Sequence, residues 1–174
     1  MKKILFIAGV AAILLFTGFK FDEWYKFTSS TGHFSISFPS KPEESTEKQK
    51  TTDGTPFDVN YVSYAPSDSE VYMVGYIDMK DFYPADKTMK EILENSRDGA
   101  TSSLEATSVN TITTNLEGDA YIEFTFTAPK ITGKDRIYVI NKFQYSVITI
   151  FSSSTGIGTN ADKFIRSFKH QGEY

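Results

Sequence analysis

Alternating apolar and polar residues, interrupted by short turn sequences, constrain the fold of this chain more than any other feature. The segment 34–38 (FSISF) places Phe34, Ile36 and Phe38 on one side of an extended backbone and two serines on the other, the pattern of a strand with one buried face. Pro39 lacks an amide proton and ends that strand. Further strands are predicted at 57–64, 71–77, 109–113, 120–127, 135–141 and 143–152. A β-sheet therefore dominates the predicted fold.

The connections between these strands are short, which favours antiparallel neighbours. Residues 65–70 have the composition of a hairpin loop, and 141–142 (NK) marks a tight turn. Residues 129–134 form a longer predicted loop in which Gly133 supplies a positive φ. Segment 43–54 is charged and has no periodicity, so it is either a solvated loop or a poorly formed strand.

Two helices are predicted among the strands. Thr88 and Glu91 have the spacing of a capping box, and Gly99 weakens this helix unless something packs close to it. One face of the helix carries Met89, Ile92, Leu93, Ser96, Ala100 and Leu104. A helix this one-sided lies on a sheet. The second helix begins after 159–162, and the chain is expected to fray from Lys169 onward. The order of elements predicts an α+β domain, a largely antiparallel β-sheet of about six to seven strands packed with two helices.

The N-terminus has the composition of an export signal. Two lysines precede an uncharged apolar run from Ile4 to Phe19, whose length lies between that of a signal peptide and that of a membrane span. Cleavage and retention as an anchor therefore both stay open. We expect 1–19 to be a signal peptide or membrane anchor, 20–32 a connecting segment and 33–170 a single domain. The domain is then periplasmic or extracellular, either released or tethered to the membrane.

Composition excludes several classes of function. The formal net charge is −4 and no Lys/Arg cluster occurs, which argues against a nucleic-acid partner. Contact of the chain with a membrane is expected only through 1–19. The chain has no cysteine and two histidines, so disulfides, lipoprotein processing and thiolate or imidazole-rich metal sites are disfavoured. The acidic residues lack the spacing of a calcium loop. We expect no metal and no cofactor.

The sequence resembles the PsbP-like α/β/α sandwich superfamily, in particular its exported bacterial branch of DcrB-type and uncharacterised proteins. The residues that carry the resemblance are the early Phe-Ser-Ile-Ser-Phe-Pro strand at 34–39, the paired hairpins, the helix around 97–100 (RDGA) and the terminal helix at 161–168. The resemblance implies binding and assembly roles more than chemistry. It transfers no functional residue to this chain.

The most unusual irregular segment is 78–86 (DMKDFYPAD), which follows a predicted central strand. Phe82 and Tyr83 are predicted to be exposed aromatics beside the acids Asp78 and Asp81. Aromatic side chains bury a large area at low entropic cost, so these four residues form a candidate partner-binding patch. The alternative is that Phe82 fills the core under the helix.

These features favour an exported or tethered, non-enzymatic domain that binds or assembles with an envelope or extracellular protein, in an oligomeric state that the sequence leaves open. One alternative is a small-ligand carrier with an apolar pocket between the sheet and the helices. Another is a hydrolase in which His33 acts as a base beside a carboxylate. The competing interpretation of His33 is a residue in a turn at the edge of a strand.

Overall fold

The computed structural model describes residues 23–172, so the predicted signal peptide or anchor at 1–19 lies outside the described part of the chain. Within 23–172, no helix is both long enough and apolar enough to cross a membrane. The described elements are, in order, β1 (Tyr25–Ser29), β2 (Phe34–Phe38), β3 (Glu43–Lys50), β4 (Pro56–Ser67), β5 (Glu70–Asp78), α1 (Met89–Ser103), β6 (Ser108–Asn115), β7 (Ala120–Thr127), β8 (Ile131–Ile140), β9 (Phe143–Ser152), α2 (Ala161–Ser167) and β10 (Lys169–His170). The predicted α+β class is confirmed.

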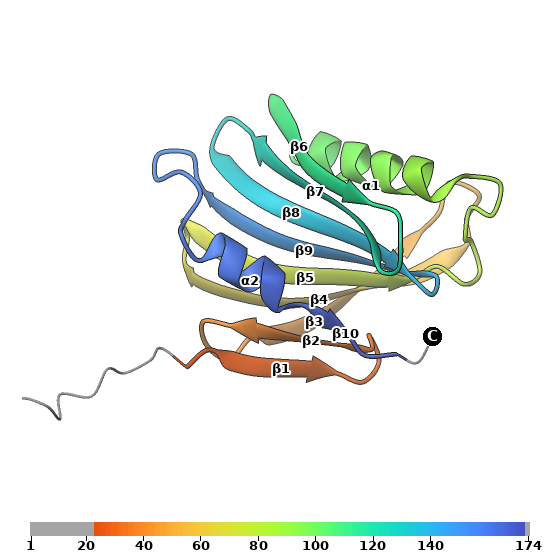
Figure 1. The fold of residues 1–174 in the computed structure, drawn as a ribbon, viewed down its shortest axis with the longest axis horizontal. Coiled ribbons are helices and arrows are strands. Elements are labelled where there is room, and N and C mark those ends of the chain that lie inside the picture. Colours follow the sequence, from red (N-terminus) through yellow and green to blue (C-terminus); the bar gives the residue numbers. More distant parts are fainter. Residues whose placement is uncertain (1–22, 173–174) are drawn as a thin grey trace, which may run out of the picture.

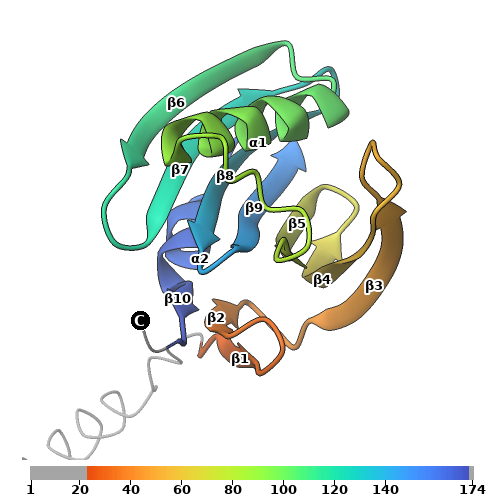
Figure 2. The ribbon, with the colours of Figure 1, turned by 90° about the vertical axis from the view of Figure 1, so that its right-hand side faces the viewer.

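The strands form two antiparallel sheets. The larger has seven strands in the order β3-β4-β5-β9-β8-β7-β6, and the smaller has three in the order β1-β2-β10. Figure 1 shows the large sheet with α1 across one face, while α2 and the small sheet lie against the other. The view in Figure 2 shows that α1 covers the half of the large sheet around β7 and β8, away from β3 and β4. The strands β8 and β9 consequently bury side chains on both faces.

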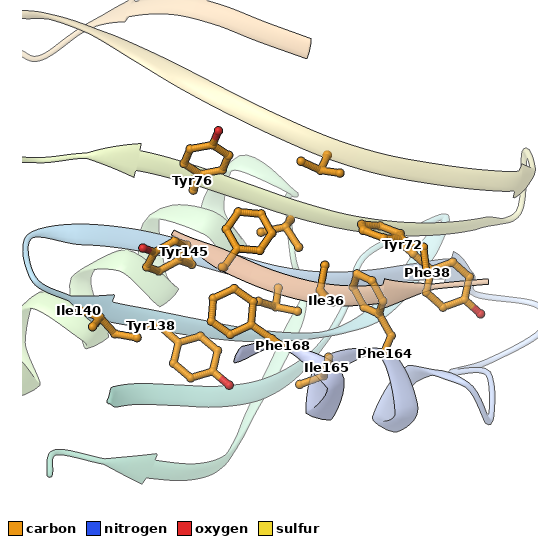
Figure 3. Packing of buried hydrophobic residues seen from close by; sticks show 14 residues of the cluster. Ile36, Phe38, Tyr72, Tyr76, Tyr138, Ile140, Tyr145, Phe164, Ile165 and Phe168 are labelled. Atoms are coloured by element: carbon orange, nitrogen blue, oxygen red, sulfur yellow. The ribbon is translucent and has the colours of Figure 1, made fainter. Parts of the chain in front are cut away.

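The core between the two sheets is largely aromatic. Phe34 of β2 packs against Tyr76, Tyr145 and Phe168, with ring centroids 5.5, 5.9 and 5.4 Å away. Figure 3 shows side chains from the large sheet and from α2 and the segment after it converging on this layer. The Tyr145 hydroxyl donates a hydrogen bond of 2.9 Å to the Gly32 carbonyl, so its polar end is satisfied inside the apolar layer.

The second core lies under α1. The predicted capping box is confirmed, because the Thr88 hydroxyl accepts from the Glu91 amide and the Glu91 carboxylate accepts from the Thr88 amide. Ile92 and Leu93 are buried on this side. They pack on a cluster that includes Ile122, Phe124, Phe126, Ile137 and Val139. Burial of this apolar face, more than helix propensity, holds α1 on the sheet.

Several boundaries differ from the sequence predictions. The segment 20–32, expected to connect, contains β1, which pairs along its full length with β2. Segment 43–54 contains an ordered but fully exposed strand, β3. The chain after Phe168 does not fray at once, because Lys169 and His170 pair with Ser35 and Phe34 of β2. Of these strands, β10 pairs with a partner that is remote in sequence, whereas β1 and β3 pair with the strands that follow them, β2 and β4.

Gly133 is placed differently from the prediction and for a different reason. It lies inside β8, and its φ is not among the positive values. A Cβ atom at this position would lie 2.3 Å from the Thr149 carbonyl oxygen and 2.5 Å from the Phe126 ring. Glycine is therefore required by the close approach of β9 and of a core aromatic, not by a turn.

We predict that Gly133→Ala lowers the free energy of unfolding by about 3 kcal/mol, because the added methyl overpacks a site bounded by backbone. The control is Gly99→Ala, since nothing lies within 4 Å of a Cβ at Gly99; this change should raise helix stability by about 0.5–1 kcal/mol. Urea unfolding followed by fluorescence measures both. Equal effects of the two substitutions would contradict the packing argument.

Candidate functional site

A pocket of about 540 Å³ opens at one end of the large sheet. It lies where the β3–β4 hairpin, the end of β5, the segment after β5 and the start of β9 come together. Its lining combines carboxylates, lysines and aromatic rings: Thr31, Lys48, Pro56, Phe57, Asp58, Asn60, Tyr76, Asp78, Lys80, Asp81, Phe82 and Phe143. The volume is within the range of small-molecule sites, although the walls are more polar than is usual for them.

The segment after β5 is a defined turn. The Met79 amide donates to the Lys142 carbonyl at 2.9 Å, and the Met79 side chain is buried, which fixes the segment to the β8–β9 turn. The Asp78 carboxylate accepts from the Lys80 amide at 2.9 Å, and the Phe82 amide donates to the Met79 carbonyl at 3.0 Å. These local bonds direct Asp78, Asp81 and Phe82 toward the pocket.

Three of the four residues of the predicted patch therefore share one pocket. Phe82 packs on Phe57 of β4 with the ring centroids 5.0 Å apart. Tyr83 does not line the pocket and instead packs against the cluster under α1. The expectation that both aromatics are exposed was wrong, because each is half-buried and Phe82 also contacts that cluster. The binding role of the patch stays a prediction.

The charges that line the pocket are mixed and mostly exposed. The Lys48 ammonium lies 3.1 Å from Asp58, and the Lys80 ammonium lies 3.5 Å from Asp78. Exposed pairs of this kind contribute little to stability and exchange readily for other partners. Asp81 is an exposed carboxylate at the rim. The pocket can therefore accept groups of either charge beside an aromatic surface.

Sequence reasoning missed most of the wall. Asp58, Asn60, Tyr76 and Phe143 come from three strands, and Thr31 comes from the turn before β2. The Thr31 hydroxyl lies 2.9 Å from the Tyr76 hydroxyl, a contact that joins the small sheet to the large one. No local motif marks these positions. Only the pairing of β5 with β4 and β9, which depends on the complete fold, brings them together.

The structure places His33 in the turn before β2, exposed and with a positive φ of 52°. Its ring meets the ring of Phe143 edge to face, with the centroids 5.6 Å apart. The hydrolase alternative requires a carboxylate or hydroxyl partner in a cleft, whereas this contact is aromatic. The second histidine, His170, lies on β10, and burial lowers the pKa of its ring.

Within residues 23–172, no group of three or more His, Asp or Glu side chains is arranged to hold a metal ion.

A cluster of charged side chains elsewhere in the large sheet pairs its opposite charges with one another. Glu123 is buried and lies 2.7 Å from the Lys134 ammonium, which in turn lies 2.6 Å from Asp162. Glu123 also pairs with Arg136, whose guanidinium lies 4.6 Å from the Tyr121 ring centroid. This arrangement joins α2 to the sheet and leaves no cluster charge unpaired.

Comparison with family models, with curated proteins and with solved structures found no match to this chain.

The most perturbed acid of the described chain lies away from the pocket. Asp135 of β8 is fully buried on the α1 face of the sheet, between Phe124 and Ile148 of the neighbouring strands. Burial raises the pKa of Asp135 to about 7, against the opposing effect of hydrogen bonds from the Ser146 hydroxyl and the Arg136 amide. The neutral acid is thus the form that the fold favours.

We predict that stability falls as the pH rises from about 4 to about 7. Over this interval the unfolded chain ionises Asp135 while the folded chain keeps it protonated, so folding becomes less favourable with each increment of pH. Asp135→Asn removes this titration and should stabilise the protein at pH 8 by up to about 4 kcal/mol. The measurement is urea unfolding at pH 4 to 8.

Ser146→Ala is the companion variant. It removes a donor to the charged carboxylate, so the decline in stability should extend to higher pH than in the unmodified chain. If the pH profile of Asp135→Asn had the same slope as that of the unmodified protein, the assignment to Asp135 would be wrong.

Proposed function

We propose that this chain is a non-enzymatic binding domain of the cell envelope, exported or tethered through residues 1–19. We place its binding site in the pocket at the end of the large sheet. The observation that carries the proposal is that Asp78, Asp81 and Phe82, the core of the predicted patch, line one pocket of about 540 Å³ together with Phe57. The partner is an envelope or extracellular protein that inserts a peptide segment there.

The chemistry of the walls supports a peptide over a purely apolar ligand. The Phe57–Phe82 pair offers an aromatic surface for an apolar side chain. Asp81 at the rim offers a charged acceptor for a basic side chain or a peptide amide. The exposed Lys48 and Lys80 can turn to a carboxylate or a carbonyl of the same segment.

We further propose that the domain belongs to the PsbP-like sandwiches. The support is architectural: an antiparallel sheet carries a helix on one face, and a terminal helix with a small second sheet covers the other. The same strands and helices that carry the sequence resemblance, β2, α1 and α2, hold these layers together. Membership would favour a binding or assembly role over catalysis.

The size of the pocket also favours a second candidate function, the carriage of a small ligand. The space between sheet and helices, where the carrier alternative placed its ligand, is occupied by two packed clusters of side chains. The pocket at the sheet end has the volume that such a ligand needs. A free ligand would contact the same residues as the inserted peptide segment, so the two functions differ in the partner and share the site.

The test uses the full chain, immobilised in mild detergent and exposed to an envelope extract. We predict that Asp81→Asn/Phe82→Ala loses at least tenfold of the captured partner, because it removes the rim charge and one ring of the Phe57–Phe82 pair and leaves Tyr83, which packs against the cluster under α1, unchanged. The matched control is Asp68→Asn/Tyr25→Ala, which changes an exposed acid in the β4–β5 turn and an exposed aromatic on β1.

Retention of every captured protein by the pocket variant would overturn the pocket as the protein-binding site. Native mass spectrometry of the purified chain separates the two candidate functions. A small molecule that remains bound to the unmodified chain and is lost in the pocket variant supports the carrier, whereas loss of a protein alone supports the peptide-binding site.

A further inference from the structure

Within residues 23–172, strand β6 forms one edge of the large sheet and pairs with β7 alone. All its residues are exposed except Asn115, which is half-buried. Figure 1 shows β6 on the side of the molecule opposite β1, where the described chain begins. The unpaired backbone groups of this edge therefore face away from the point at which the domain joins its N-terminal segment.

The composition of β6 is unusual for an open edge. No charged residue occurs between Glu105 and Glu117, and the strand itself (SVNTITTN) is rich in β-branched residues. Five large hydrophobic residues are exposed in the described chain, and three of them, Val109, Ile112 and Leu116, lie on β6 or directly after it. An exposed edge that is uncharged and partly apolar is a template for strand addition.

The opposite edge of the same sheet provides the contrast. Strand β3 (EESTEKQK) is equally exposed but carries five charged side chains in its eight residues. Charged side chains on an edge hinder pairing with another sheet. The two edges are thus unequal, and only β6 lacks this protection.

Local contacts keep β6 extended without closing its outer side. The Arg97 guanidinium of α1 donates to the Thr111 hydroxyl at 3.0 Å, which ties the strand to the helix. A bulge between Thr111 and Thr113 adds one residue relative to β7. Val109 and Thr114 are an odd number of positions apart, so regular alternation would place them on opposite faces of the sheet. Because of the bulge, both lie on the α1 face, opposite Phe126 and Ile122 of β7.

We propose that β6 is a docking strand for β6 of a second copy of this chain. The two strands pair antiparallel about a two-fold axis, and the two seven-stranded sheets become one continuous sheet. In the register that places Thr111 of one copy opposite Thr114 of the other, Val109 lies opposite Leu116. Because the bulge shifts the alternation in both copies, the two side chains of each pair then lie on the same face of the sheet.

A second copy fits this edge better than a charged strand does. An uncharged strand pairs with itself without bringing like charges together along the ladder, and two-fold pairing of β6 with β6 closes, whereas pairing of β6 with β3 would continue into filaments. Glu105 and Glu117 flank the strand in both copies. Their mutual repulsion should be screened by salt, so dimerisation should strengthen as ionic strength rises.

The absence of cysteine in the chain permits a direct test on the full-length protein in mild detergent. We predict that Ile112→Cys forms a disulfide-linked dimer under mild oxidation, whereas Thr46→Cys at the centre of β3 does not. Light scattering should show a reversible dimer, with a dissociation constant on the order of 10 μM, since one strand pair buries less area than a standard interface. Ile112→Lys should weaken it at least tenfold, and Thr46→Lys should not.

Three results would overturn the proposal. The first is a monomer at 200 μM in high salt. The second is a dimer that Ile112→Lys leaves intact, which would assign association to another part of the chain, such as residues 1–19. The third is cross-linking of Thr46→Cys as efficient as that of Ile112→Cys. A foreign strand bound to β6 would block self-pairing, so the chain would form its dimer only after salt removes the foreign protein. A pure sample that stays monomeric in high salt excludes self-pairing.

Discussion

Burial of side chains against both faces of the large sheet is the constraint on which the rest of the structure depends. On one face, aromatic side chains such as Tyr72 and Tyr145 pack under the small sheet and α2. On the other, Ile148 of β9 packs with the side chains under α1. A chain of this length without disulfides has to obtain its stability from such packing. The cover formed by the small sheet and α2 is assembled from segments near both ends of the described chain, so this core closes only when β1, β2 and β10 are in place.

The pocket follows from where these covers end. Helix α1 lies over β7 and β8. Helix α2 lies over β8 and β9 and also contacts β2. Neither helix reaches the end of the sheet where β3 and β4 project beside the turn that follows β5. Side chains there are only half-buried, and Phe57 and Phe82 cover each other. Incomplete burial beside a fixed turn is the physical reason that a hollow with mixed charges forms at this place.

Much of the fold could be predicted from the sequence because its strongest signals are local. The alternation of Phe34, Ile36 and Phe38, the capping box at Thr88 and the Asn141-Lys142 turn each correspond to an element of the structure. The small sheet could not be predicted, because β10 has two residues and gains its hydrogen bonds from β2, far away in sequence. Gly133 shows the same limit: its neighbour is a carbonyl of β9, which no local pattern reveals.

The candidate site was only partly predictable for the same reason. The turn after β5 was visible as an irregular acidic and aromatic segment, whereas Asp58 and Phe143 join it only through strand pairing. The order of the sheet also separates the two proposed surfaces. The pocket is built at the half formed by β3, β4 and β5, and β6 is the strand farthest from β3. A dimer joined through β6 therefore leaves both pockets open, at the two outer ends of one continuous sheet, so that each could bind its partner without competition from the dimer contact.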